Sequence, residues 1–151
     1  MHDLLIEGGT VVDGSGSPPR EAAQSDPERF KRFPLHLITP KSEDRYLSQW
    51  AHDEELNRGE ETPLTLHPAD AKAREIADGD RVRVFNDRGE ARLVARIDDA
   101  VKAGVVVFPQ GRWISRDGLS TNVLTHDGVT DMGYGAIYFD CLVQVERIAA
   151  D

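Results

Sequence analysis

Cysteine is almost absent from the sequence, since Cys141 is the only one in 151 residues. A single thiol cannot form an internal disulfide, and it cannot by itself supply an iron–sulfur cluster or a cysteine-based zinc site. Cys141 lies in an apolar strand pattern, so we expect a buried and unreactive thiol, which is the usual state of a free cysteine. The sequence therefore excludes a disulfide framework and a cysteine-ligated metal centre within this chain.

Long apolar runs are also missing. No run approaches the roughly 20 residues that are needed to span a bilayer. The first three residues carry no basic cluster, and the apolar run at residues 4–6 is too short for a secretory signal. We therefore expect a soluble, cytoplasmic protein without membrane insertion.

Basic residues are scarce relative to acidic ones. The chain has 18 Lys and Arg against 27 Asp and Glu, which gives a net charge of −9. Binding of nucleic acid requires clustered Lys and Arg to neutralise phosphates, so this balance argues against a nucleic-acid partner. An anionic small ligand would have to be held by backbone N–H groups and a few placed cations, against the field of the whole protein.

The first 33 residues differ from the rest of the chain. Two short apolar segments, residues 3–6 and 10–12, flank Gly8-Gly9 and predict a hairpin. Residues 14–19 are rich in Gly, Ser and Pro and predict a flexible linker. Pro27 is placed to begin a short helix. We expect residues 1–33 to form an appendage and residues 34–151 to form one domain.

Residues 34–50 organise that domain. Residues 35–39 predict a strand, and Pro40 ends it because proline cannot donate a ladder hydrogen bond. A loop rich in Thr, Lys, Ser, Arg and Gln follows. So many donors beside one strand end suit a polyanionic ligand, although composition alone also permits an ordinary solvated turn.

Short apolar segments recur at regular intervals after residue 60 and are bounded by Gly, Pro, Asn or Asp. This pattern is typical of strands that are joined by turns. Together with the strand at residues 35–39 and two short helices, the series predicts a closed or nearly closed small β-barrel. The further predicted strands are residues 64–66, 80–85, 90–97, 105–108 (buried on both faces), 136–139 and 142–145.

The segments between these strands also carry signals. His67 caps a short helix that starts at Pro68 and is predicted to end near Ile76. Residues 86–89 (Asn-Asp-Arg-Gly) predict a hairpin turn, because Asn and Gly can adopt positive φ. Residues 109–113 directly follow a buried strand, and they are compatible either with a ligand-facing loop or with a simple β-turn.

Taken in order, these segments resemble the C-terminal molybdopterin dinucleotide-binding domain of the dimethyl sulfoxide reductase family. The resemblance implies an all-β fold with short helices, namely a six-stranded double-psi β-barrel of the aspartate-decarboxylase-like type. The residues that carry it are Leu35-His36-Leu37-Ile38-Thr39-Pro40-Lys41-Ser42, Arg45, Ser48-Gln49-Trp50, His67-Pro68-Ala69-Asp70-Ala71, residues 76–89, Gly104-Val105-Val106, Pro109-Gln110-Gly111, Asn122-Val123-Leu124-Thr125 and residues 142–146.

The resemblance also implies a function. In that family the domain covers one side of the bis(molybdopterin guanine dinucleotide) cofactor, which contains Mo or W, and the metal ligand lies in another domain. This chain is then expected to bind the cofactor as a domain or small subunit of an oxidoreductase, beside a larger catalytic domain or subunit. It is expected to contribute no catalytic residue and no metal ligand, which leaves open whether the chain counts as an enzyme.

Site residues follow from the resemblance by position. Lysine at 41 and leucine at 47 replace residues that are often histidine in the family. Lysine can still meet phosphate as a point charge, whereas Leu47 cannot replace a hydrogen bond, and Glu43 and Asp44 add negative charge beside the loop. The side chains implied to line the dinucleotide and the pterin are Thr39, Lys41, Ser42, Arg45, Ser48, Gln49 and Asn122, with Gln110 and Tyr138 as further candidates.

Residues 1–22 resemble a different family, the first strands of amidohydrolases of the N-acyl-D-amino-acid deacylase type. The resemblance is carried by residues 3–16 and by Pro18-Pro19. The metal chemistry of those enzymes requires a His-x-His pair after the hairpin, and this sequence has none. We therefore expect no hydrolase activity from this segment.

Two alternatives to cofactor binding remain open from the residues. A double-psi barrel can be a protein-interaction or adaptor module without cofactor, as in the N-terminal domains of some AAA ATPases. A barrel of this type can also be a self-processing enzyme of the aspartate-decarboxylase kind, which requires a Gly-Ser step. Here Gly14-Ser15 and Gly16-Ser17 both precede the predicted barrel.

Overall fold

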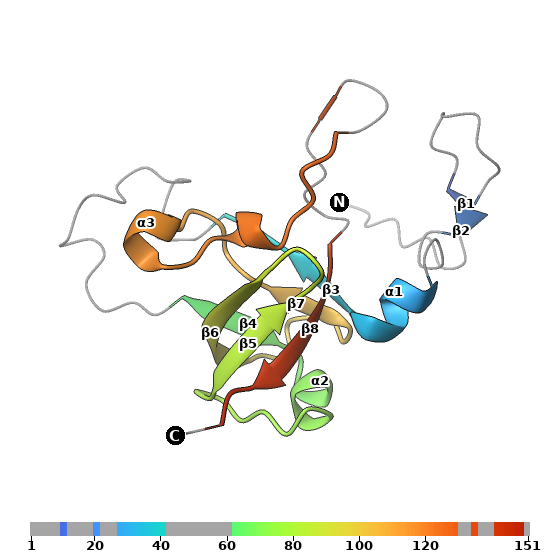
Figure 1. The fold of residues 1–151 in the computed structure, drawn as a ribbon. Helices are drawn as coiled ribbons and strands as arrows, with labels where there is room; N and C mark the ends of the chain where they lie inside the picture. The colour runs from blue at the N-terminus through green and yellow to red at the C-terminus, as the bar shows by residue number, and fades with distance from the viewer. Residues whose placement is uncertain are drawn as a thin grey trace.

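Six strands form a closed barrel in the order β3-β7-β4-β6-β5-β8 (Figure 1). The computed structural model describes residues 27–41, 62–129, 134–135 and 141–149, and also the backbone of residues 10–11 and 20–21. The barrel strands are β3 (Leu35–Ile38), β4 (Pro63–Leu66), β5 (Arg81–Phe85), β6 (Glu90–Ile97), β7 (Val105–Val107) and β8 (Leu142–Arg147).

The barrel mixes parallel and antiparallel pairing. β3 pairs with β7 and β4 pairs with β6 in parallel, and the four other neighbouring pairs are antiparallel. In a parallel pair both strands end on the same side, so the loops after β3 and β7 leave the barrel together. This arrangement confirms the predicted six-stranded double-psi β-barrel with short helices.

The core follows the period of two along the strands. Val82 and Val84 of β5 are buried, as are Ala91, Leu93 and Ala95 of β6, because alternate side chains of a strand point to the same face. Burial of each Val or Leu side chain stabilises the fold by about 1.5–3 kcal/mol. Further large side chains that are fully buried are Leu35, Leu37, Leu64, Leu66, Val106, Phe108, Leu124, Val143 and Val145.

The prediction that residues 105–108 are buried on both faces is wrong for β7. Val106 is fully buried, whereas Val105 and Val107 are half-buried. A closed barrel has only one interior, so alternate side chains of each strand point outward. A continuous apolar run therefore does not require two covered faces.

The N-terminal strand pairing also differs from the expectation. β1 (Thr10–Val11) pairs antiparallel with β2 (Arg20–Glu21), whereas the sequence predicted pairing with residues 3–6, which lie outside the described residues. The Gly- and Pro-rich segment that was predicted as a linker, residues 14–19, lies outside the described residues.

Helix α1 (Pro27–Arg32) begins at Pro27, as predicted. The Arg32 guanidinium forms an ion pair with the Asp87 carboxylate in the β5–β6 turn. Next to the helix, the buried Phe33 ring packs edge-on against Phe85, with 6.2 Å between ring centroids. These contacts attach α1 to the end of β5. The division of the chain at residues 33 and 34 stays a prediction.

Helix α2 (Pro68–Lys72) has the predicted start and an earlier end. The His67 Nδ1 atom accepts a hydrogen bond from the Ala69 N–H at 3.0 Å, which confirms the cap. The helix stops four residues before Ile76, and Glu75 adopts a positive φ of 55°. This reversal of the chain directs Ile76 into the core, where it is buried.

Asp70 of α2 joins this helix to the β6–β7 connection. Its Oδ2 atom accepts a hydrogen bond from the Gly104 N–H at 2.7 Å, and its Oδ1 atom lies 3.8 Å from Arg74 Nη1. We predict that Asp70→Ala lowers the free energy of unfolding by about 1–3 kcal/mol, because it leaves the half-buried Gly104 N–H without its acceptor. Urea denaturation measures this change. Asp99→Ala, at an exposed acid, is the control, and an equal loss in both variants would contradict the prediction.

Candidate functional site

The loops after β3 and β7 run side by side at one end of the barrel. The Phe108 N–H donates to the Ile38 carbonyl at 3.1 Å, and the Gln110 N–H donates to the Pro40 carbonyl at 2.9 Å. Lys41 and Gln110 then form an isolated parallel bridge. The parallel pairing therefore continues past the strands and holds two of the predicted site residues next to each other.

The loop after Gln110 leads into a short helix, α3 (Ile114–Asp117), which the sequence did not predict. The Asp117 Oδ2 atom accepts from the Trp113 N–H at 2.9 Å, and its Oδ1 atom lies 3.7 Å from Arg112 Nη1. Gly118 ends the helix in the left-handed conformation, with φ of 69°. Residues 109–113 therefore form a loop that is fixed by a following helix and not a simple β-turn, and the ligand-facing role of this loop stays a prediction. The Asp-Gly pair was the only signal for the end of the helix.

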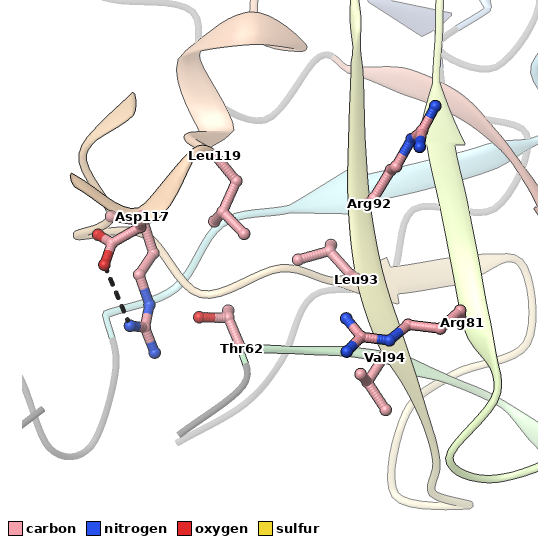
Figure 2. Close-up of a pocket in the computed structure, with 8 residues that line it drawn as sticks. Thr62, Arg81, Arg92, Leu93, Val94, Asp117 and Leu119 are labelled. Carbon is pink, nitrogen blue, oxygen red and sulfur yellow. Dashed lines mark ion pairs between the residues drawn. The ribbon is translucent and has the colours of Figure 1, made fainter. Parts of the chain in front are cut away.

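A cavity of about 310 Å³ lies beside this helix (Figure 2). The Thr62 hydroxyl points into it, is buried, and has no hydrogen-bond partner among the residues that the structure describes. The Arg81 guanidinium approaches Thr62, whereas that of Arg92 points away from it. Leu93, Val94 and Leu119 supply apolar walls. Sequence reasoning missed this cavity, because its lining residues are far apart in the chain and share no motif.

The 3-10 helix η1 (Thr121–Val123) carries Asn122. The Ser120 Oγ atom caps it by accepting from the Asn122 N–H at 3.2 Å. Ser120 and Thr121 are buried, whereas Asn122 is exposed. Figure 1 shows η1 and α3 at the barrel end toward which β3 runs. Asn122 therefore lies at the same end as Lys41 and Gln110, on a separate element.

The predicted site residues thus fall into two groups. Lys41, Gln110 and Asn122 lie at one barrel end, where Lys41 and Asn122 are exposed and Gln110 is half-buried. Thr39 lies at the same end, but it is only 5% exposed. The other predicted residues lie outside the described part of the chain, and they are Ser42, Arg45, Ser48, Gln49 and Tyr138.

Metal-ligating side chains do not gather in the described parts of the chain. Within them, no group of three or more His, Cys, Asp or Glu side chains could hold a metal ion. In the same residues, none of the helices has both the length and the apolar character needed to cross a membrane. The barrel end with Lys41, Gln110 and Asn122 instead offers one cation and two side-chain amides, with hydrogen-bonded backbone around them.

Comparison with known proteins decides which family this barrel belongs to. The model of the family described as "Molydopterin dinucleotide binding domain" matches residues 35–142. The chain belongs to this family. The matched residues span the barrel from the start of β3 to the start of β8, and they include Lys41, Gln110 and Asn122.

Relatives of the chain are large reductases. A biotin sulfoxide reductase from Cereibacter sphaeroides is 34% identical over 99% of this chain and 23% of the relative. The dimethyl sulfoxide reductase DmsA of Escherichia coli K12 is 32% identical over 78% of this chain and 15% of the relative. The chain thus belongs to the dimethyl sulfoxide reductase family and spans less than a quarter of the length of these relatives.

A solved structure supports the fold. Acetylene hydratase from Pelobacter acetylenicus superimposes with a TM-score of 0.69 at 23% identity, over 83% of this chain and 20% of that chain. The barrel is therefore a fold that also occurs within a much longer protein.

We predict that Asp117→Ala lowers the free energy of unfolding by about 1–3 kcal/mol, because the Trp113 N–H and the half-buried Arg112 both lose a partner. Asp117→Asn keeps an oxygen acceptor for that N–H, so we expect it to cost clearly less. Urea unfolding followed by tryptophan fluorescence compares the two variants. Equal losses in both would show that the hydrogen bond to Trp113 contributes nothing.

Proposed function

We propose that this chain holds a molybdopterin guanine dinucleotide at the barrel end defined by Lys41, Gln110 and Asn122. Membership in the molybdopterin dinucleotide-binding family carries the proposal, since the family match covers the barrel from the start of β3 to the start of β8. The position of these three residues supports it further, because residues that are distant in the sequence meet at one accessible end.

The residues present fit the chemistry of such a ligand. A dinucleotide carries a diphosphate, which an exposed lysine can meet as a point charge. A pterin and a guanine present both donors and acceptors at their edges, and the side-chain amides of Gln110 and Asn122 offer both. The Gln110 N–H is already bonded to Pro40, so Gln110 would act through its side chain. When bound, the cofactor supplies the redox chemistry, and these residues bind and orient it.

We further propose that the metal is Mo or W and that a larger catalytic domain or subunit completes the site. The matched region makes up 23% of the biotin sulfoxide reductase and 15% of DmsA, so most of each relative lies outside that region. In this arrangement residues 34–151 bind one side of the dinucleotide, and residues 1–33 are an appendage. The metal ligand, the substrate site and any second dinucleotide would lie in the partner. A cytoplasmic location remains a prediction from the sequence.

Purification of the chain from its native source tests the proposal. We expect a large partner subunit or domain to co-purify, with Mo or W detected by metal analysis and GMP released by acid hydrolysis of the diphosphate. An assembly that lacks both the metal and the nucleotide would refute cofactor binding and favour an adaptor role.

We predict that Lys41→Ala and Asn122→Ala each reduce the bound dinucleotide by about tenfold or more under dilution, because each removes a hydrogen bond to a charged or polar group of the ligand. Released GMP per mole of protein measures the retained cofactor. Lys102→Ala is the matched control, since Lys102 lies in the connection before β7, at the opposite end of that strand. Equal retention in all three variants would contradict the assignment of this barrel end.

A further inference from the structure

The turn between β5 and β6 packs against the segment that carries Asn122. The turn comprises residues 86–89 and lies at the same barrel end as Lys41, because β6 runs antiparallel to β7 through their shared neighbour β4. The sequence predicted only a hairpin turn here, with Asn and Gly chosen for positive φ. Neither Asn86 nor Gly89 adopts a positive φ. The prediction that these two residues occupy the turn because of their tolerance of positive φ is therefore wrong.

Asn86 uses its side chain to bond the turn to two other segments. The amide is buried, with 8% of the residue exposed. Its Nδ2 atom donates to the Leu124 carbonyl at 2.9 Å and to the Leu142 carbonyl at 3.1 Å. Its Oδ1 atom accepts from the Arg88 N–H at 2.9 Å, which closes the turn. Both amide hydrogens and the oxygen are therefore used, and one of these bonds holds the residue that follows η1.

Gly89 is required by close approach. A Cβ atom at this position would lie 2.8 Å from the Val123 carbonyl oxygen, a distance that real Cβ atoms essentially never show. The obstructing atom belongs to the backbone of η1, so a larger residue at 89 would have to separate the turn from η1. The glycine thus allows the turn and η1 to pack backbone against backbone.

Cys141 adds a third contact to the same segment. Its Sγ atom is fully buried and donates to the Leu124 carbonyl at 3.1 Å. The Leu124 side chain is itself fully buried in the core. The carbonyl therefore receives hydrogen bonds from Asn86 and Cys141, and a longer one from Arg88 Nη1 at 3.5 Å. The predicted burial of this thiol is confirmed, and its hydrogen bond links the residue before β8 to the residue after η1.

We propose that Asn86 and Gly89 are positioning residues, which fix η1 so that Asn122 faces the bound dinucleotide. This inference rests on the proposed function, because Asn122 is the residue through which it acts. A turn that served only to join β5 to β6 would need neither an amide bonded to Leu124 nor a glycine against Val123. Fixing η1 before binding reduces the ordering cost that the ligand would otherwise meet.

Hydrogen exchange on the full chain tests the packing of η1 directly. We expect Gly89→Ala and Asn86→Ala to raise amide exchange at residues 123–125 by about tenfold, because the contacts that hold this segment are lost. Gly79→Ala is the matched control. Gly79 has φ of +83° and open space around its Cβ position, so that variant strains the backbone without touching η1. Gly89→Ala removes no hydrogen-bonding side chain, so it remains informative if Asn86→Ala does not fold.

Cofactor retention is the second measurement, made on the same variants purified from cells that produce the cofactor. We expect Gly89→Ala to lose the dinucleotide to the same extent as Asn122→Ala, with Gly79→Ala retaining it. Equal exchange at residues 123–125 in Gly89→Ala and Gly79→Ala would overturn the inference. Faster exchange with full retention in Gly89→Ala, while Asn122→Ala loses the cofactor, would also overturn it. Faster exchange with full retention in both variants would support the positioning of η1 and refute the proposed role of Asn122.

Discussion

The parallel pairing of β3 with β7 is the constraint on which the rest of the site depends. Parallel strands cannot be joined by a tight hairpin, so their pairing brings together residues that are separated by some of the longest connections in the chain. The pairing extends beyond the strands to Lys41 and Gln110. The remaining pairs close the barrel, which fixes that end as one rigid surface and brings η1 and the β5–β6 turn to it.

Electrostatics of the chain are compatible with this site despite the net charge of −9. Arg83, for example, forms exposed ion pairs with Glu90 and Glu146 on the outside of the barrel. Exposed pairs of this kind contribute little to stability and little to long-range attraction. Recognition of an anionic ligand must therefore come from local placement of donors, and a rigid barrel end can provide that placement.

Local patterns in the sequence predicted the strands, the helix cap and the barrel. Val82, Val84, Leu93 and their neighbours alternate with a period of two, and this period survives in the fold because each strand has one inward face. Features that arise from contacts between distant segments were not predictable. The sequence suggested that Gly89 serves the turn through its conformational freedom, whereas the structure shows that it allows close approach to Val123. Helix α3 was missed because four residues are too few to give a periodic pattern. The candidate site residues came from a family resemblance, since Lys41, Gln110 and Asn122 share no spacing that predicts their meeting.

The central claim is that the barrel end formed by Lys41, Gln110 and Asn122 faces the dinucleotide. An experimental structure of the chain in its native assembly measures this most directly. The account predicts density for the dinucleotide against this end, with the Asn122 amide within hydrogen-bonding distance of the ligand. Dinucleotide density on a different face of the barrel, or protein side chains packed over this end in place of a ligand, would contradict it.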